Sequence, residues 1–465
     1  VQEFYMTFPA IGYTSLWLGN YDLTLSDFVF KDANGKLLTV LHPDAKNEWN
    51  NIPNMIALEA DATINLFSLG WQVRERGYFH INASERINSN VRVPKSIFSR
   101  VLNQKITPKE PIDIMSTSAY AEVAFGYSHY INEQWSVGAK AKLLLGHGYL
   151  DASVDNFDFR SSVDEVTLKG NVTTQHAGIA KNLINGSFDK DMWTYLNPSG
   201  YGAAFDLGIT YKPIEMIQIS AAVTDLGFIK WTGQLGDDKN LKPFENGSFT
   251  IDKTFTGAGG FEYGDYIKDD KFQMNELISD IKNNLQLYQD EFLQYEAKNA
   301  QPITQMLHAN LNIGVDANFW ENRVGVGVYS HTSFMTDTIT EEVTLGAAFR
   351  PCNWFNIAAS YSFLNGKWSN MGAAFGFAPY DGFMLTLAAD YVPTMYVEGE
   401  KINLPYKTSG LNLAVGIAIV AGTNNPKKTI DKDRDGVFDY RDGCLLTPKD
   451  IRVDEFGCPT DEDGD

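Results

Sequence analysis

Acidic residues near the C-terminus have the spacing of calcium ligands. Carboxylates occupy positions 1, 3, 5, 9 and 12 of the segment 431–442, and Gly436 occupies position 6. Calcium takes about six to eight oxygen ligands, and alternate residues of a tight turn can point theirs inward. Glycine permits the sharp turn, and the carbonyl of position 7 supplies a further oxygen. The predicted ligands are Asp431, Asp433, Asp435, the carbonyl of Val437, Asp439 and Asp442.

A second acidic loop begins at the end of the sequence. Asp461, Asp463 and Asp465 alternate with Glu462 and Gly464, as in the first half of the preceding loop. We therefore expect these three carboxylates to bind calcium as well. The alternative interpretation of the whole segment is a solvated acidic linker that holds cations loosely.

This segment resembles the thrombospondin type 3 repeats that Bacteroidota use as a neck between an outer-membrane barrel and an OmpA-like domain. The resemblance rests on the 431–442 loop, Cys444, the triplet Gly457-Cys458-Pro459 and the second acidic loop. It implies a periplasmic neck over residues 423–465 and a peptidoglycan-binding domain beyond Asp465. Cys444 and Cys458 both lie in the neck and are the natural disulfide pair in an oxidising periplasm, which leaves Cys352 over.

Composition allows one large membrane barrel. The chain has 465 residues, of which 44% are hydrophobic and 13% aromatic, with 39 glycines. Its longest apolar stretch, 413–422, is too short to cross a bilayer as a helix, but a barrel strand needs only every second residue apolar. The net charge of -20 argues against a nucleic-acid partner. The first residue is Val1 rather than Met, which suggests a removed signal peptide.

Strict two-residue alternation predicts β-strands. Between Ser136 and Gly146, apolar residues fall on one face, while Lys140 and Lys142 share the other face with serine and glycine. Two lysines on one face of an apolar strand suit the wet interior of a barrel. The same alternation appears around Phe67 and Phe205. Fourteen strands are predicted, near 9–19, 60–73, 76–86, 117–131, 135–148, 201–212, 215–228, 306–319, 323–332, 340–350, 354–363, 369–378, 382–391 and 408–420.

Short turns and long connections should lie at opposite ends of this barrel. We assign the turns at 132–134, 212–215, 321–323, 351–353 and 379–382 to the periplasm, because outer-membrane barrels keep short turns there and long loops outside. The barrel then covers residues 1–422, and both of its ends are periplasmic. Parity makes 20–59, 87–116, 149–200 and 229–305 extracellular loops or inserts in the lumen.

One loop should contain an amphipathic helix. An apolar stripe with steps of three and four residues predicts a helix over 272–296, at the extracellular side or in the barrel mouth. Such a helix could pack on its own protein, dock a partner or plug the pore. The stripe comprises Met274, Ile278, Ile281, Leu285, Tyr288, Phe292 and Tyr295.

No motif for catalysis is present. Nucleophile elbows, paired zinc-binding histidines and phosphate-binding glycine loops do not occur in the sequence. His129 and His147 lie on neighbouring predicted strands, which invites a metal or catalytic interpretation, but structural hydrogen bonding is the better explanation. The same holds for Asp206 and Asp225. We expect no enzyme.

Two stretches extend the resemblance to the barrel. Residues 13–28, which begin Tyr-Thr-Ser-Leu-Trp-Leu-Gly-Asn, and residues 204–231 are similar to a Bacteroidota family of outer-membrane barrels of uncharacterised function. That family is distantly similar to FadL-like barrels of fourteen strands, which carry hydrophobic molecules. The resemblance implies an all-β transmembrane barrel in outer-membrane lipid.

Two functional hypotheses follow. The first is a barrel that anchors the outer membrane to peptidoglycan through a calcium-braced neck and serves a larger complex of outer-membrane proteins for assembly, secretion or gliding. The second is a FadL-like or porin-like conduit for small or hydrophobic molecules. The neck favours the first hypothesis, because a passive pore needs no tether.

Overall fold

A computed structural model gives the fold of the chain. It describes residues 4–7, 12–20, 23–32, 35–40, 46–53, 55–73, 76–95, 105–106, 112–161, 165–178, 198–232, 245–256, 267–268, 271–273, 275–276, 279, 296–299, 302–320, 322–335, 339–352, 354–364, 367–379, 382–392, 396–397, 404–405, 408–421, 437, 444, 447, 453, 458 and 459.

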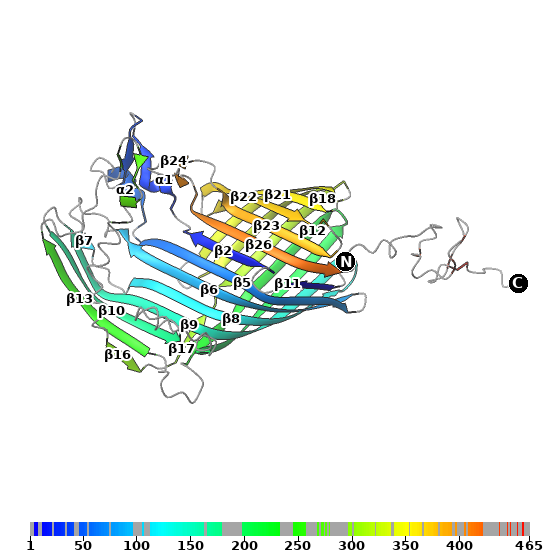
Figure 1. The fold of residues 1–465 in the computed structure, drawn as a ribbon, viewed down its shortest axis with the longest axis horizontal. Helices are drawn as coiled ribbons and strands as arrows, with labels where there is room; N and C mark the ends of the chain where they lie inside the picture. The colour runs from blue at the N-terminus through cyan, green and yellow to red at the C-terminus, as the bar shows by residue number, and fades with distance from the viewer. Residues whose placement is uncertain are drawn as a thin grey trace.

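Fourteen antiparallel strands close into a barrel (Figure 1), as the alternation predicted. The ring closes where β26 pairs with the first strand, which consists of two segments, β1 and β2. Both segments also pair with β5. The strands are β1 (Phe4–Thr7) with β2 (Thr14–Gly19), β5 (Met55–Val73), β6 (Gly77–Pro94), β8 (Ile112–Tyr130), β9 (Trp135–Ser161), β11 (Gly200–Ile214), β12 (Ile217–Trp231), β17 (Ile303–Met306) with β18 (Ala309–Phe319), β19 (Val324–Phe334), β20 (Ile339–Cys352), β21 (Phe355–Leu364), β22 (Lys367–Phe377), β23 (Phe383–Val392) and β26 (Gly410–Ala421).

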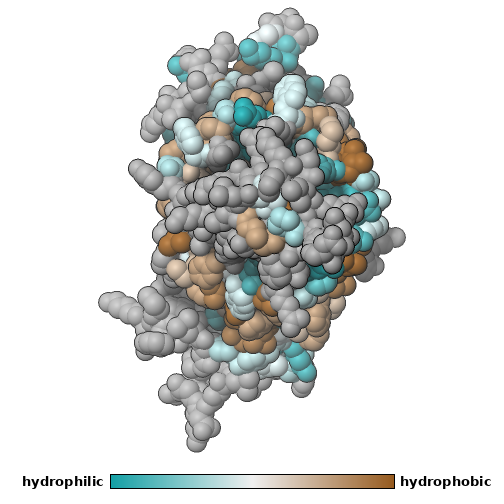
Figure 2. Space-filling view, turned by 90° about the vertical axis from the view of Figure 1, so that its right-hand side faces the viewer, coloured by the Kyte–Doolittle hydropathy of each residue, from teal (hydrophilic) through white to brown (hydrophobic). Residues whose placement is uncertain are grey.

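The two faces of the barrel wall differ in polarity. On β9, the side chains of Val137 and Leu143 are exposed on the outside, while Lys142 is buried on the inside. On β11, Phe205 and Leu207 are exposed in the same way. In a closed ring every strand has two partners, so the backbone leaves no unpaired edge toward lipid. The exposed apolar residues outside and the buried lysine inside agree with the predicted apolar outer band and polar lumen. Figure 2 looks at the barrel from the end toward which β26 points and shows hydrophobic residues there.

The short hairpin turns lie at one end of the barrel, the end at which β1 begins and β26 ends. Phe4 is the register partner of both Trp71 and Ala421, which places the start of β1, the end of β26 and the β5–β6 turn together. In Figure 1, the orange arrow of β26 ends on this side. Trp135 stacks on Tyr211 here, with ring centroids 4.3 Å apart, as expected of an aromatic girdle.

At the opposite end, strands continue where loops were predicted. β6 and β9 run past the predicted ends at 86 and 148, and β9 exchanges its partner β11 for β10 beyond Gly146. The predicted strands are too short because their ends were placed where the alternating apolar residues stop. The backbone hydrogen bonds between strands continue beyond that point, in segments with polar side chains. The strands of this extension are β7 (Lys105–Ile106), β10 (Glu165–Gly178), β13 (Glu245–Thr256) and β16 (Glu296–Asn299).

A small unit formed by the described residues between Leu23 and Ile56 lies at the same end (Figure 1). Leu23, Val40, Ile52 and Ile56 form its buried core. Lys95 of the β6 end donates a hydrogen bond to the carbonyl of Ile52, at 2.7 Å. Its elements are α1 (Leu25–Phe28), β3 (Val29–Lys31), β4 (Leu37–Thr39) and α2 (Lys46–Asn51).

The predicted helix over 272–296 is confirmed at Asn275, Glu276 and Ser279, which are helical, but it is too long at both ends. Phe272 belongs to β15 (Lys271–Phe272), which pairs with β14 (Ile267–Lys268), and Glu296 begins β16. Backbone pairing with a neighbouring strand outweighs the local helical pattern there. All seven residues of the apolar stripe lie outside the described residues.

The remaining hairpin joins β24 (Tyr396–Val397) to β25 (Leu404–Pro405).

Among the described residues, no helix combines the length and the apolar character that crossing a bilayer requires.

Candidate functional site in the barrel lumen

Five charged side chains meet inside the barrel and form what we call the lumen charge cluster: Arg86, Glu122, Lys142, Asp206 and Asp225. The Lys142 ammonium lies 2.6 Å from one Asp225 oxygen and 2.7 Å from an Asp206 oxygen. The Arg86 guanidinium makes two hydrogen bonds to the Asp225 carboxylate, at 2.8 and 3.3 Å, and a third to Glu122 at 3.2 Å. Every charge in the cluster therefore has an oppositely charged partner, which offsets the cost of removing it from water.

Local backbone geometry directs the Asp225 side chain toward the other members of the cluster. The pairing of β11 with β12 shifts register between Phe205 and Leu207, and Asp225 has a φ of 59°. A β-bulge adds one residue to a strand and redirects a side chain, and aspartate tolerates the left-handed region better than most residues. The Asp225 amide donates a 2.8 Å hydrogen bond to the Asp206 carboxylate, which satisfies the backbone at the bulge.

The ion pair between Arg86 and Asp225 crosses the lumen. Arg86 belongs to β6 and Asp225 to β12, and three strands, β8, β9 and β11, separate them around the wall. The guanidinium also lies over the ring of Tyr120, 5.7 Å from its centre. The pair therefore ties two distant parts of the wall together and narrows the interior between them.

An apolar core lies beside the charged residues. We call it the Trp231 cluster, and its centre, Trp231, is fully buried. Gly146 and Gly200 leave the space for its indole, since a Cβ at either position would lie within 2.6 Å of a ring carbon. The indole nitrogen donates to Gln305 at 3.0 Å. The cluster consists of Tyr120, Leu144, Tyr149, Ala177, Ala204, Ile229 and Trp231.

Two polar hollows follow each other along the same strands. The proximal hollow, toward the short turns, has a volume of about 380 Å³ and is lined by Tyr5, Asn65, His80, Asn82, Arg86 and Glu122, among others. The distal hollow has a volume of about 350 Å³ and is lined by Glu59, Asp61, Asn88, Asn90, Arg92 and Asp151, among others.

A third hollow, of about 260 Å³, follows the wall from β18 to β23. Small side chains dominate its lining, including Gly327, Gly346 and Ser360. Two aspartates, Asp316 and Asp390 of β23, line it as well. Asp316 accepts a hydrogen bond from the Tyr329 hydroxyl. The lumen is thus filled by large side chains beside β8–β12 and lined by small ones on the other side.

Sequence reasoning identified only part of this site. Asp206 and Asp225 were assigned structural hydrogen bonding, and they do form such bonds, but within the lumen charge cluster. Arg86 and Glu122 were missed. Each is a charged residue at a strand position whose side chain faces the lumen. The alternation of the strand predicts that facing, so it could have identified both residues.

The histidine prediction is consistent with the structure. His129 contacts the Tyr127 hydroxyl at 3.1 Å, and His147 contacts Glu85 at 3.0 Å, so the two make separate structural contacts. Within the part of the chain that the structure describes, no three His, Cys, Asp or Glu residues are grouped as a metal site.

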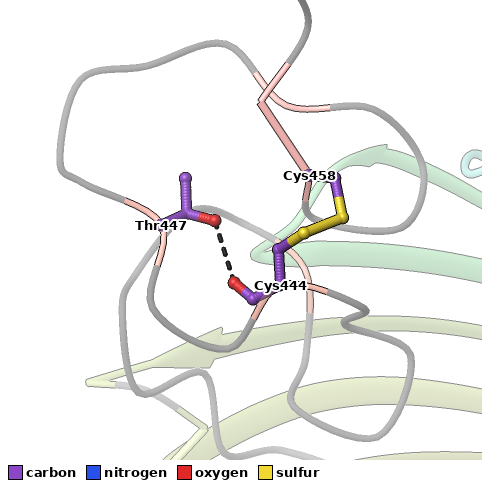
Figure 3. The surroundings of a disulfide bond; sticks show 3 residues. All are labelled: Cys444, Thr447 and Cys458. Atoms are coloured by element: carbon purple, nitrogen blue, oxygen red, sulfur yellow. Dashed lines mark hydrogen bonds between the residues drawn. A yellow bond between two sulfur atoms is a disulfide. The ribbon is translucent and has the colours of Figure 1, made fainter.

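The C-terminal segment contains a disulfide between Cys444 and Cys458 (Figure 3). The Thr447 hydroxyl donates to the Cys444 carbonyl at 2.9 Å, and Val453 pairs with Pro459. Of the predicted calcium ligands, the described residues include only Val437. The other predicted ligands lie outside the described residues: Asp431, Asp433, Asp435, Asp439, Asp442, Asp461, Asp463 and Asp465.

Comparisons with known proteins identify one sequence family. A sequence profile described as "Family of unknown function (DUF5723)" matches residues 1–390. No curated protein shows significant similarity to the chain.

Several solved channel and porin structures are similar to it. A deltaS2S3 mutant of TodX, a P. putida monoaromatic hydrocarbon channel, is 11% identical with a TM-score of 0.43, covering 90% of each chain. A Pseudomonas aeruginosa FadL homologue is 9% identical with a TM-score of 0.41, also covering 90% of each chain. A mutant of the Rh. blastica porin is 8% identical with a TM-score of 0.24, covering 89% of this chain and 99% of the porin.

Proposed function

We propose that this chain, which belongs to the family of unknown function DUF5723, is an outer-membrane barrel that lets small molecules pass through its lumen. The observation that carries the proposal is the pair of polar hollows that follow each other inside the closed ring. The exposed apolar residues outside, including Phe205 and Leu207, support a location in lipid. Carboxylates, amides and hydroxyls inside offer partners to a hydrated solute that leaves bulk water.

This proposal prefers the conduit hypothesis to the anchor hypothesis, although the sequence favoured the anchor. The anchor hypothesis rests on the C-terminal segment alone, whereas the conduit rests on the lumen of the barrel itself. Charges such as Lys142 and Asp225 are paired with each other in that lumen, an arrangement that suits a polar passage better than a reactive centre.

Solute uptake by proteoliposomes tests the conduit. We expect liposomes that contain the purified full chain to swell in isosmotic arabinose faster than empty liposomes, with a rate that falls as the sugar becomes larger. Protein that was heat-denatured before reconstitution is the control for leakage. Swelling no faster than in empty liposomes, for every solute down to glycine, contradicts passage through the lumen.

A second role, compatible with the first, involves the C-terminal segment. The specific observation is the disulfide between Cys444 and Cys458, which closes a loop beside the acidic residues. We infer that this segment is a calcium-bound periplasmic neck that leads toward peptidoglycan and holds the barrel in a complex with other outer-membrane proteins. Carboxylate and carbonyl oxygens are the donors that calcium prefers. Asp431, Asp433, Asp435, the Val437 carbonyl, Asp439 and Asp442 would hold one ion, and Asp461, Asp463 and Asp465 would begin a second site.

Calorimetric titration of the full chain tests the neck. We expect calcium to bind more tightly than millimolar in chelator-treated buffer, because five carboxylates within twelve residues repel one another until a cation joins them. Asp433→Asn with Asp435→Asn should weaken binding at least about tenfold, since affinity follows the number of charged ligands. The control, Asp450→Asn with Asp454→Asn, removes two carboxylates outside the loop spacing. Equal binding by both double variants would reduce the segment to an acidic linker.

A further inference from the structure

The boundary between the two polar hollows coincides with the row of Arg86. On β6, the proximal hollow ends at Arg86, and the distal hollow begins at Asn88. On β8, the corresponding limits are Glu122 and Ser118, with Tyr120 between them. Arg86 and Tyr120 are register partners, so both strands place the division at the same level.

The bond that crosses the lumen at this level is the ion pair between Arg86 and Asp225. We propose that this pair is the gate between the two hollows, so that Arg86 and Asp225 determine which solutes pass. The inference rests on the proposed passage of small molecules through the lumen. It goes beyond that proposal in naming where the passage is closed and by which residues.

The cluster has the connections that a reversible gate needs. Arg86 keeps Glu122 as a second partner at 3.2 Å, and Asp225 keeps Lys142 at 2.6 Å. The Arg86–Asp225 pair can therefore separate while each charge retains an opposite charge. Without such second partners, opening would leave two buried charges uncompensated, which is strongly unfavourable.

The balance of charges at this level predicts the sign of each variant's selectivity. The cluster contains three carboxylates and two cationic groups, and Lys140 adds a third cation 3.6 Å from Asp206, so the positive and negative charges are equal in number. Arg86→Gln removes a cation and should shift ion preference toward cations. Asp225→Asn removes an anion and should shift it toward anions. Both variants should also raise conductance, because each weakens the bond across the lumen.

Single-channel recording in planar bilayers tests the gate. We expect Arg86→Gln and Asp225→Asn to raise the open probability or conductance several-fold over the wild type, with reversal potentials displaced in opposite directions. The double variant Arg86→Gln with Asp225→Asn leaves the net charge of the cluster unchanged, so its reversal potential should match that of the wild type while its conductance stays raised. The matched control is Arg76→Gln, which removes a guanidinium from the exposed β5–β6 turn. A heat-dependent shift in gel migration verifies that each variant is folded.

Thiol labelling separates the gate from the conduit. Thr63→Cys, in the proximal hollow, is combined with Cys352→Ser, so that it is the one free thiol beside the Cys444–Cys458 disulfide. The protein is then exposed to a bulky membrane-impermeant maleimide added at the distal end. Protease cleavage of the C-terminal segment reports the orientation of the protein in the liposomes. Labelling should be about tenfold faster in the Asp225→Asn background, the change that accompanies a shift of ~1.4 kcal/mol in the closed–open equilibrium.

The outcomes are distinct. Faster labelling without any solute uptake would support the gate and contradict the proposed conduit. Uptake and conductance that are the same in the wild type and both charge variants, with unchanged labelling, would overturn the gate. Such a result would place the passage along the wall of small side chains from β18 to β23.

Discussion

Replacement of Trp231 by alanine is expected to destabilise the barrel by about 3–5 kcal/mol, the range for removing a large aromatic side chain from a core. Trp231 is fully buried, and its ring centroid lies 5.1 Å from that of Tyr149. Gly146 and Gly200 cannot fill the space that the indole leaves, because neither has a side chain. The loss should appear as a lower urea midpoint, measured by the mobility shift between folded and unfolded barrel in gels.

Trp320→Ala is the matched control for this prediction. Trp320 lies in the β18–β19 turn with 77% of its surface exposed, so its removal should change the free energy of unfolding by less than about 0.5 kcal/mol in detergent. Similar midpoints for the two alanine variants would show that the Trp231 cluster is not a core.

Leu207→Arg should destabilise the barrel in a bilayer by about 2–4 kcal/mol, the cost of a cationic side chain near the membrane midplane. Leu207 is exposed on the outer face of β11, within the apolar band. Its neighbour Gly208 faces the lumen, where an added Cβ would meet its nearest atom, in Ala222, at an ordinary 3.7 Å. Gly208→Arg therefore places the same charge one residue away but inside.

Unfolding in liposomes compares the two variants. We expect Leu207→Arg to lower the urea midpoint clearly and Gly208→Arg to change it little, because a polar lumen accepts a charge that lipid does not. If both variants lost the same stability, or if Gly208→Arg lost more, the assignment of faces along β11 would be wrong.

Strand number and facing follow from local sequence. Side chains of a strand alternate with a period of two, so the placement of Lys140 and Lys142 opposite Val137 fixed the two faces of β9 without knowledge of its neighbours. Turn residues between alternating segments gave the hairpins and hence the count of fourteen. Strand ends were predicted less well, because β9 continues past the apolar band with polar side chains such as Asp151 and Ser153.

The two ends of the helix predicted over 272–296 show where local sequence was overruled, although Asn275, Glu276 and Ser279 between them are helical. At Phe272 and Glu296, hydrogen bonds to β14 and β13 replaced helical ones. Backbone pairing between distant segments depends on where the barrel places them, and no periodicity of a single segment contains that information.

The sequence by itself therefore determined the barrel: its strands, its short turns, and which residues face outward or inward. Tertiary structure alone decided what the inward residues do. Arg86 and Asp225 are 139 positions apart in the chain, yet their side chains meet at 2.8 Å. That contact depends on ring closure, the bulge at Asp225 and the distance between two walls. These are properties of how fourteen strands are arranged, and each strand's sequence specifies only its own two faces.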